Sequence, residues 1–467
     1  MTVRASADLV VLGGGPAGLA AAWWTARAGH RVVLLERGER PGGLAASFTL
    51  DGVRVDLGSH RLHPSIDPAI LRELEGILDG QLQRRLRNGR INLDGRLIRF
   101  PLRPADLVRK LPPSFALGVA ADTLTGPLRR RRAGAAEPSF ASVLRAGLGP
   151  TMCDRFYFPY ARKLWGLEPD QIDAEQARRR VSASSPAKLL ARVARGLRSE
   201  PVFFWYPRDG FGTISERLAG AAAAAGADVR LGSAATGVVF EPGGITVTTA
   251  DGVITAPRVW STIPLGALAR IADPAPPPEV ADAARSLQLR AMTLVYLVLD
   301  GRPYTTFDAH YLPDPGTPVS RVSEPANYRD GGDPPDRTVL CAEIPCARDD
   351  AIWSASDEEL GRVVTEALDR AGLPAPRVRS VHVRRVPAVY PVYRTGYGTA
   401  LAALDDWAGR QPGLLTLGRQ GLFAHDNTHH TLSMALAAAD ALGADGSFDE
   451  RAWASARARF ETHVVED

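Results

Sequence analysis

The sequence is poor in lysine and in long hydrophobic runs, and the lack of long hydrophobic runs argues against an integral membrane protein. Of its 56 lysine and arginine residues, only Lys110, Lys163 and Lys188 are lysine. Glycine, proline or arginine interrupts every apolar run before the roughly 18 residues that a transmembrane helix needs. We therefore expect no integral membrane segment. Because Met1 to Ala7 is too short for a signal peptide, we also expect a cytoplasmic protein.

Cysteine is scarce as well. The three cysteines, Cys153, Cys341 and Cys346, are an odd number and none belongs to a C-x-x-C pair. This pattern argues against a disulfide framework and against a cysteine-rich zinc site. The net charge is only +4, and the basic run Arg129–Arg132 could touch nucleic acid or an anionic membrane. We interpret it as a solvated run and expect no nucleic-acid partner.

The stretch from Asp8 to Gly43 has the pattern of a dinucleotide-binding unit. An apolar run of strand length, Leu9–Leu12, is followed by G-x-G-x-x-G where the strand must turn into a helix. The first glycine permits a tight turn, the second lets a pyrophosphate approach the backbone, and the third lets helix and strand pack closely. A second strand, Arg31–Leu35, ends at Glu36. Its carboxylate can accept hydrogen bonds from a ribose and would repel a 2′-phosphate, which favours an unphosphorylated adenine dinucleotide.

The residues after Glu36 distinguish FAD from NAD. Arg40-Pro41-Gly42-Gly43-Leu44 continues the unit as R-x-G-G. This continuation resembles the flavoprotein superfamily of amine oxidases, protoporphyrinogen oxidases and UDP-galactopyranose mutases. The resemblance implies that the cofactor is FAD, with Gly42 and Gly43 in backbone contact with it.

A loop that follows this unit carries polar residues suited to a flavin. Residues Phe48 to His63 alternate around Asp51-Gly52 like a β-hairpin and deliver Gly58-Ser59-His60-Arg61 as a loop. A glycine, two hydrogen-bonding side chains and a cation suit the edge of an isoalloxazine ring. The alternative is a turn with an exposed histidine.

A second candidate flavin segment is Leu417–Leu442. Gly418 ends a strand, and Asn427 or Thr428 caps an alanine-rich helix whose positive N-terminal end can face a flavin carbonyl. Five of the nine histidines lie in the two flavin segments, at positions 60, 63, 425, 429 and 430. Because none has a recognised metal spacing such as H-E-x-x-H, we expect proton transfer and hydrogen bonding from them and no metal site.

An aromatic stretch, Phe156–Ala174, indicates the substrate side. Tyr160 and Trp165 flank Arg162 and Lys163 there. Aromatic and cationic side chains together suit a pocket for a flat or anionic ligand, although aromatics at helical spacing more often form core.

The remaining pattern predicts the following elements. We expect helix over 67–86, a hairpin over 90–100, amphipathic helix over 101–132, a helix from Thr213 or Ser215 to Gly226, and strands within 229–254, 259–264, 289–299 and 381–393. The 101–132 region could line an apolar tunnel or lie against a membrane, and we prefer burial against the domain.

The segments GSHRLH, YARKLW, YPRDGFG, AVYPVY and GRQGLFAHDNTHH occur in the order found in UDP-galactopyranose mutase and its oxidoreductase relatives. The resemblance covers nearly the whole chain. It implies an α/β fold with a Rossmann-type FAD-binding domain of the glutathione reductase and amine oxidase type, interleaved with an α+β substrate domain. The FAD-binding domain would comprise 1–66, 206–265 and 396–467. The substrate domain would comprise 67–205, mainly helical, and 266–395, mainly sheet. A chain of 467 residues has room for two such domains.

The resemblance also implies individual roles. Arg419 would contact the FAD pyrophosphate, a backbone group of Val238 would contact adenine, and His60 would lie near the flavin. The residues that we assign to the cofactor are Gly13, Gly15, Pro16, Ala17, Gly18, Glu36, Arg37, Gly42, Gly43, Leu44, Gly58, Ser59, His60, Arg61, Val238, Gly418, Arg419, Asn427, Thr428 and Thr431. The candidate catalytic or substrate residues are His60, His63, His425, Arg290, Tyr160, Trp165 and Tyr390.

Two departures from the mutase pattern bear on function. A tyrosine that grips the sugar-nucleotide diphosphate corresponds to His425 here, and an arginine with a similar role falls near Ser184. Without them, recognition of a diphosphate would weaken, since the planar guanidinium matches phosphate geometry. Residues Arg178 to Arg180 could supply the missing charge.

The leading functional hypothesis is an FAD-dependent oxidoreductase that transfers a hydride between a small-molecule substrate, such as a sugar- or amine-containing biosynthetic compound, and flavin N5. One of His60, His63 and His425 would take the accompanying proton. The second hypothesis is a non-redox isomerase of nucleotide sugars, and the third is a flavin-binding protein without catalysis. An external electron acceptor could be oxygen, a quinone or a partner protein, and the pattern specifies no oligomeric state.

Overall fold

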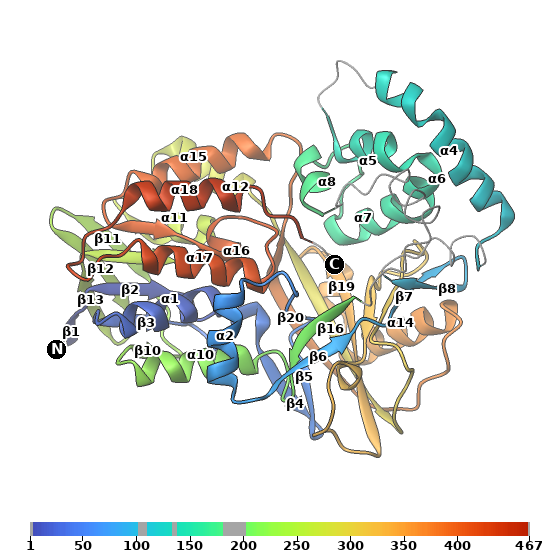
Figure 1. Ribbon diagram of the computed structural model, residues 1–467, viewed down its shortest axis with the longest axis horizontal. Helices are drawn as coiled ribbons and strands as arrows, with labels where there is room; N and C mark the ends of the chain where they lie inside the picture. The colour runs from blue at the N-terminus through green and yellow to red at the C-terminus, as the bar shows by residue number, and fades with distance from the viewer. Residues whose placement is uncertain (1–2, 101–109, 133–137, 181–201, 466–467) are drawn as a thin grey trace.

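The computed structural model describes residues 3–100, 110–132, 138–180 and 202–465. Its centre is a five-stranded parallel sheet, which occupies the left half of Figure 1. The strands, in spatial order, are β10 (Asp228–Arg230), β3 (Val32–Leu35), β2 (Leu9–Leu12), β14 (Arg258–Ser261) and β21 (Leu414–Thr416). They come from three separate stretches of chain, and β2 directly precedes the glycine-rich turn.

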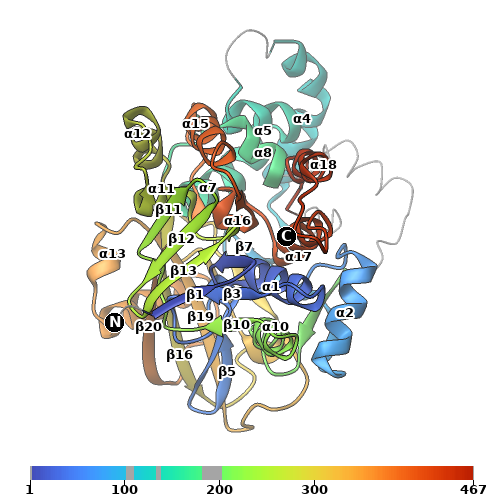
Figure 2. The ribbon, with the colours of Figure 1, turned by 90° about the vertical axis from the view of Figure 1, so that its left-hand side faces the viewer.

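Strand β2 is buried on both faces, which is why its four residues are all apolar. Leu9 and Val11 belong to one hydrophobic cluster, and Val10 and Leu12 belong to another, as the two-residue period of a strand requires. The first cluster includes side chains of α1 (Pro16–Arg27), α10 (Thr213–Ala224) and α17 (Thr428–Asp440). Figure 2 shows these three helices on one side of the sheet.

The second cluster lies beneath another sheet and three helices. That sheet has the order β1 (Val3–Ser6), β13 (Gly252–Ala256), β12 (Gly244–Thr249), β11 (Gly237–Glu241) and β15 (Ala272–Asp273). The helices are α11 (Leu265–Ile271), α12 (Pro278–Ser286) and α15 (Tyr397–Gly409). The central sheet is thus covered on both faces, as a Rossmann-type fold requires.

A seven-stranded sheet forms the other half of the protein. Its order is β20 (Val378–Pro391), β16 (Leu289–Asp300), β19 (Arg337–Cys346), β18 (Arg321–Ser323), β17 (Ala309–Tyr311), β7 (Gly89–Leu93) and β8 (Arg96–Phe100). Helix α14 (Asp357–Arg370) packs on one face. The hairpin of β4 (Ser47–Leu50) and β5 (Val53–Asp56) packs on the other face and so connects the two halves.

A helical segment lies next to this sheet, at the upper right of Figure 1. It contains α4 (Pro113–Arg132), α5 (Phe140–Leu148), α6 (Pro150–Met152), α7 (Phe158–Trp165) and α8 (Ala174–Arg180), with a π-helical turn at Cys153–Tyr157. The further elements are α2 (Pro68–Leu78), the paired strands β6 (Leu82–Leu86) and β9 (Phe203–Pro207), α13 (Ala351–Ser354), α16 (Gly418–Gly421), α18 (Glu450–Phe460) and 3-10 turns at Gly43–Ala45 and Pro325–Tyr328.

The α/β fold class and both hairpins are confirmed, and two local predictions are wrong. The helix expected to reach residue 86 ends at Leu78, because Asp79 and Gly80 both adopt positive φ (49° and 73°) and reverse the chain into β6. Neither Thr213 nor Ser215 caps α10, because both lie inside the helix and its cap is Gly212. Of the amphipathic region, residues 101–109 lie outside the described residues. Within the described ranges, no helix combines the length and the hydropathy needed to cross a bilayer.

Candidate functional site

The glycine turn after β2 is tightly packed on one side and open on the other. Gly13 has φ +104°, and a methyl group there would lie 2.4 Å from Oγ1 of Thr262. A methyl group on Gly18 would lie 2.0 Å from the Gly13 carbonyl oxygen. Gly15, by contrast, has no atom within 4 Å of where its Cβ would lie. The turn therefore presents bare backbone at the N-terminus of α1, where Gly15 provides no side-chain cap.

Glu36 and the two following glycines complete this cradle. The Glu36 carboxylate accepts hydrogen bonds from the N–H groups of Gly14 (2.6 Å) and Gly38 (2.7 Å). Gly42 (φ +122°) and Gly43 (φ +52°) bring the chain back to the turn, so that a Cβ on Gly43 would lie 3.3 Å from the Cα of Gly15. The R-x-G-G continuation thus lies directly against the G-x-G-x-x-G turn.

The segment after β21 approaches the same turn. Gly418 has φ +79°, and its Cβ would lie 3.0 Å from that of Ala17. The next residue, Arg419, donates from Nη1 to the carbonyl of Asp426 (3.0 Å). Its Nε and Nη2 atoms are buried and have no hydrogen-bond partner among the described residues, and burial lowers the pKa of the guanidinium. A buried cation with unsatisfied donors suits an anionic ligand group.

The Gly58–Arg61 loop joins the two halves of the protein. The Ser59 N–H donates to Glu343 of β19 (2.9 Å), and the Ser59 and Tyr328 hydroxyls are 2.6 Å apart. Arg61 donates to the Tyr328 hydroxyl (3.1 Å). His60 stacks on the Phe211 ring and its Nε2 lies 3.0 Å from the Leu57 carbonyl. Burial lowers the pKa of His60, so the neutral imidazole is favoured.

A buried ion pair stands beside this loop. Arg321 of β18 binds both carboxylate oxygens of Glu343, at 2.7 and 2.8 Å, and the two side chains are 13% and 4% exposed. Tyr160 of α7 and Tyr390 of β20 lie within electrostatic reach of Arg321, and burial raises the pKa of Tyr160 well above its ordinary range. We refer to the Gly58–Arg61 loop, the Arg321–Glu343 pair, Tyr160 and Tyr390 together as the polar wall, because Arg321 interacts with Glu343 and with both tyrosines.

His425 lies in an aromatic enclosure at the far end of that wall. Its ring contacts Trp165 (6.4 Å between centroids), Tyr390 (6.1 Å) and Tyr393 (4.9 Å). The Tyr390 ring also has the guanidinium groups of Arg180 and Arg419 near its faces, at 5.4 and 5.2 Å. Burial, reinforced by these two cations, holds the pKa of His425 well below its ordinary value, and a nearby Pro391 carbonyl opposes the shift. The neutral form of the His425 imidazole is therefore favoured.

The other predicted residues lie in several places. His63 is 2.6 Å from the Ser65 hydroxyl and stacks on His429 at 5.3 Å. Arg290 packs its guanidinium against Gly166 and donates to the Pro345 carbonyl (3.4 Å). Val238 is buried in β11, paired with Val247. The residues at the exposed rim of the turn are Arg37 and Gly43, whereas Pro16 and Leu44 are half-buried. Ser184 lies outside the described residues.

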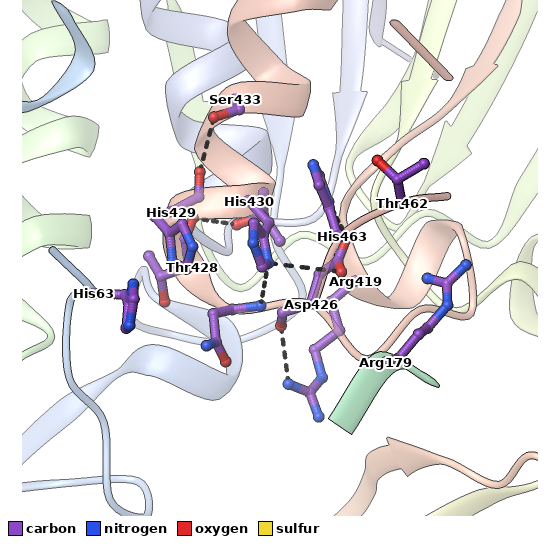
Figure 3. A network of polar contacts seen from close by, with 12 residues as sticks. His63, Arg179, Arg419, Asp426, Thr428, His429, His430, Ser433, Thr462 and His463 are labelled. Atoms are coloured by element: carbon purple, nitrogen blue, oxygen red, sulfur yellow. Dashed lines mark hydrogen bonds and ion pairs between the residues drawn. The ribbon is translucent and has the colours of Figure 1, made fainter. Parts of the chain in front are cut away.

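Asn427 is confirmed as the residue preceding α17, and the first turn of that helix holds a cluster of imidazoles (Figure 3). The rings of His429 and His430 are 3.9 Å apart, and those of His430 and His463 are 4.2 Å apart. Thr431 donates to the Thr428 carbonyl (2.9 Å). Burial lowers the pKa of His429 to about 3 and that of His430 to about 2.

Sequence reasoning missed the ion pair of Arg321 and Glu343. The two residues are separated by 22 positions on neighbouring antiparallel strands, and Arg321 directly faces Glu343 in the register. Glu343 is a single charge in an otherwise apolar run, TVLCAEIPC, in which every residue is buried. That isolated charge is the signal that could have indicated a functional position.

The fold and the site together define a protein with a Rossmann-type, dinucleotide-binding half and a second half built on a seven-stranded sheet. Residues 16–441 match the model of the flavin-containing amine oxidoreductase family, and the chain belongs to that family. Its cofactor is FAD. The residues fit this group: the space in front of Gly15 and the unpaired Arg419 donors suit a pyrophosphate, and Glu36 suits a ribose.

Similar proteins include flavin-containing monoamine oxidase AofH of Mycobacterium tuberculosis, 29% identical over 281 residues. That alignment spans 58% of this chain and 60% of the relative. A crystal structure of reduced UDP-galactopyranose mutase has a TM-score of 0.82 at 19% identity, covering 98% of this chain and 100% of that one. Putrescine oxidase bound to putrescine has a TM-score of 0.69 at 19% identity, covering 94% and 99%. These two likenesses establish the fold alone.

Proposed function

We propose that the protein is an FAD-dependent oxidoreductase that exchanges a hydride between a small-molecule substrate and flavin N5. The observation that carries this proposal is the contact between the Ser59 N–H and Glu343, because it joins the loop that follows the cofactor cradle along the chain to the polar wall on the seven-stranded sheet. When bound, FAD supplies the hydride acceptor or donor. The protein supplies binding groups and a place for the proton.

Two neutral imidazoles are available to take that proton. His60 engages the Leu57 carbonyl through Nε2, which leaves Nδ1 as the free ring nitrogen. His425 is fully buried, and the Pro391 carbonyl lies within hydrogen-bonding reach of its ring. Both have lowered pKa values, so both are unprotonated at neutral pH. We favour His425 as the base, because one ring nitrogen can donate to the Pro391 carbonyl while the other keeps its lone pair inside the aromatic enclosure.

The charges of the wall indicate the substrate class. The carboxylate of Glu343 is neutralised by Arg321, and Arg180 and Arg419 stand beside Tyr390. A cationic amine would meet a net positive field in a buried site. The Nε of Arg321 is buried and unpaired within the described chain, so it can donate to a further oxygen. We therefore propose a neutral or anionic substrate rich in oxygen, such as a sugar derivative, over a simple amine.

Anaerobic titration tests this proposal. Purified holoenzyme is mixed with nucleotide sugars, alcohols and amines while the oxidised flavin band is followed. We expect an oxygen-rich compound to bleach the band and His425→Ala to slow the bleaching while FAD stays bound. Bleaching by amines alone would refute the substrate class, and bleaching at the wild-type rate in both His60→Ala and His425→Ala would refute the base.

A second candidate is a non-redox isomerase of nucleotide sugars. It is favoured by the guanidinium group of Arg180 beside Tyr390, which suits a phosphate ester and which the proposed FAD site does not use. The two functions separate in one assay. An isomerase interconverts a nucleotide sugar only after reduction with dithionite, without net bleaching or reoxidation, whereas the oxidoreductase is bleached by its substrate. A protein that does neither would be a flavin-binding protein without catalysis.

A further inference from the structure

One carboxylate and two imidazoles converge at the N-terminal end of α17 (Figure 3). Asp426 lies in the loop before the helix, His430 in its first turn, and His463 in the C-terminal segment after α18. One ligand atom from each residue lies within 4.8 Å of the others. Three stretches of the fold thus meet at one point, which the proposed hydride exchange does not use.

The Asp426 carboxylate lacks a full set of partners. His463 Nδ1 lies 3.1 Å from Oδ2, and His430 Nδ1 lies 3.7 Å from Oδ1, too far for a hydrogen bond. The residue is 2% exposed, and its Oδ1 atom is buried with no hydrogen-bond partner in the described ranges. A buried carboxylate oxygen without a donor costs free energy unless a cation or a donor is supplied.

The neighbouring arginines lie within electrostatic reach of the Asp426 carboxylate but donate no hydrogen bond to its Oδ1 atom in the described ranges. Arg419 donates to the backbone carbonyl of Asp426, and Arg179 donates to Glu175 at 2.7 Å. The positive end of α17 and these two arginines repel a loosely bound cation. Only a metal ion that forms strong, directional bonds to imidazole nitrogen would bind here against that repulsion.

We propose that Asp426, His430 and His463 form a binding site for a divalent transition metal of the zinc, cobalt or nickel class, with water in the remaining positions. Two imidazoles and a carboxylate are ligands that such ions prefer, whereas magnesium and calcium prefer oxygen alone. Zinc–nitrogen bonds of about 2.0–2.1 Å require the ligand atoms to draw together. The His430 and His463 rings, now stacked 12° from parallel, must turn so that their lone pairs converge. His430 must also release the 3.3 Å hydrogen bond from the Asn427 N–H.

The ion would tie the C-terminal segment to the cofactor half. His463 follows α18, and the Val465 N–H donates to the Arg179 carbonyl (2.7 Å), so this segment already bridges α17 and α8. Metal binding would fix the loop whose Asp426 carbonyl holds Arg419. The site therefore has a structural role, which can be tested without any assay of turnover.

Cobalt(II) titration of the tag-free holoenzyme tests the proposal, since cobalt bound to nitrogen ligands absorbs visibly. We expect one equivalent to bind the wild type and the affinity to fall at least about tenfold in both His463→Ala and Asp426→Asn. His382→Ala is the matched control, because His382 lies on β20 and contacts Ser380. It should bind cobalt like the wild type.

His463→Gln, together with the FAD content and circular dichroism of each variant, separates loss of the ligand from loss of the fold. A wild type that binds no stoichiometric cobalt would overturn the proposal and leave a plain hydrogen bond between His463 and Asp426. Equal binding by wild type, His463→Ala and Asp426→Asn would overturn it as well. Because FAD binding and flavin bleaching are read separately, failure of this site is distinguishable from failure of the proposed function.

Discussion

Replacing Gly15 with alanine should weaken FAD binding without harming the fold. The backbone at Gly15 has φ −78° and ψ 174°, which alanine adopts readily. No protein atom outside the immediate chain neighbours lies within 4 Å of the position that a Cβ atom would take there. The apoprotein should therefore be as stable as the wild type or more stable by about 0.4–1 kcal/mol, because alanine reduces the entropy of the unfolded chain.

The methyl group would instead occupy space that the cofactor needs. The second glycine of this motif is the point of closest approach between backbone and pyrophosphate. Forcing one extra methyl group into a packed contact costs about 1–3 kcal/mol. At 1.4 kcal/mol for each factor of ten, this cost corresponds to a rise of about 5- to 150-fold in the Kd for FAD.

The assay is reconstitution of the apoprotein with FAD, and binding is monitored as quenching of the flavin fluorescence. The Tm of the apoprotein is measured separately by circular dichroism. Gly220→Ala is the control, because Gly220 also has no atom within 4 Å of its Cβ position but lies in α10. It should keep the wild-type Kd and gain about 1 kcal/mol. If Gly15→Ala binds FAD like the wild type, the assignment of this turn to the pyrophosphate is wrong.

Three further predictions follow from buried groups. Gly18→Ala should destabilise the apoprotein as well as weaken FAD binding, because its methyl group would lie 2.0 Å from the Gly13 carbonyl, and a Tm equal to that of Gly15→Ala would contradict this packing. Arg321→Met should cost about 3–5 kcal/mol by leaving Glu343 buried and unpaired, and the added Glu343→Leu change should restore most of it in urea unfolding. Burial lowers the pKa of His310 to about 4, so the unfolded chain binds more protons between about pH 6.5 and 4, and stability should fall by up to about 3 kcal/mol as the pH falls through that window. The fall should be shallower in His310→Gln, measured as unfolding free energy against pH.

The sequence predicted the strand, glycine turn and helix of the Asp8–Gly43 unit well, because their determinants are local. The glycine turn, the acid at the end of the second strand and the R-x-G-G continuation all lie within 36 residues, from Asp8 to Gly43, and each has a conformational reason to be where it is. The helix cap at Asn427 is equally local. Such features depend on spacing along the chain, which the sequence displays directly.

The polar wall was less predictable because its Arg321–Glu343 pair meets only through strand pairing. Arg321 and Glu343 become partners through the register of β18 and β19, and no spacing rule indicates that register. Arg290 was an expected substrate residue, yet its guanidinium packs against Gly166. The position of His463 was also not predictable from spacing along the chain, because it meets Asp426 and His430 only where α18 returns the chain to α17. The prediction that the helix continues to residue 86 was wrong for a different reason. The helix ends at Leu78 because Asp79 adopts a left-handed conformation that its residue type alone does not demand.

The most direct test of the account is single-turnover bleaching of the flavin band under anaerobic conditions, using the most effective compound of the titration series with and without deuterium at the reacting carbon. Hydride exchange predicts that bleaching occurs in one turnover and is slower with the deuterated compound. If no compound bleaches the band, and dithionite-reduced protein interconverts a nucleotide sugar, the central claim is wrong and the protein is an isomerase.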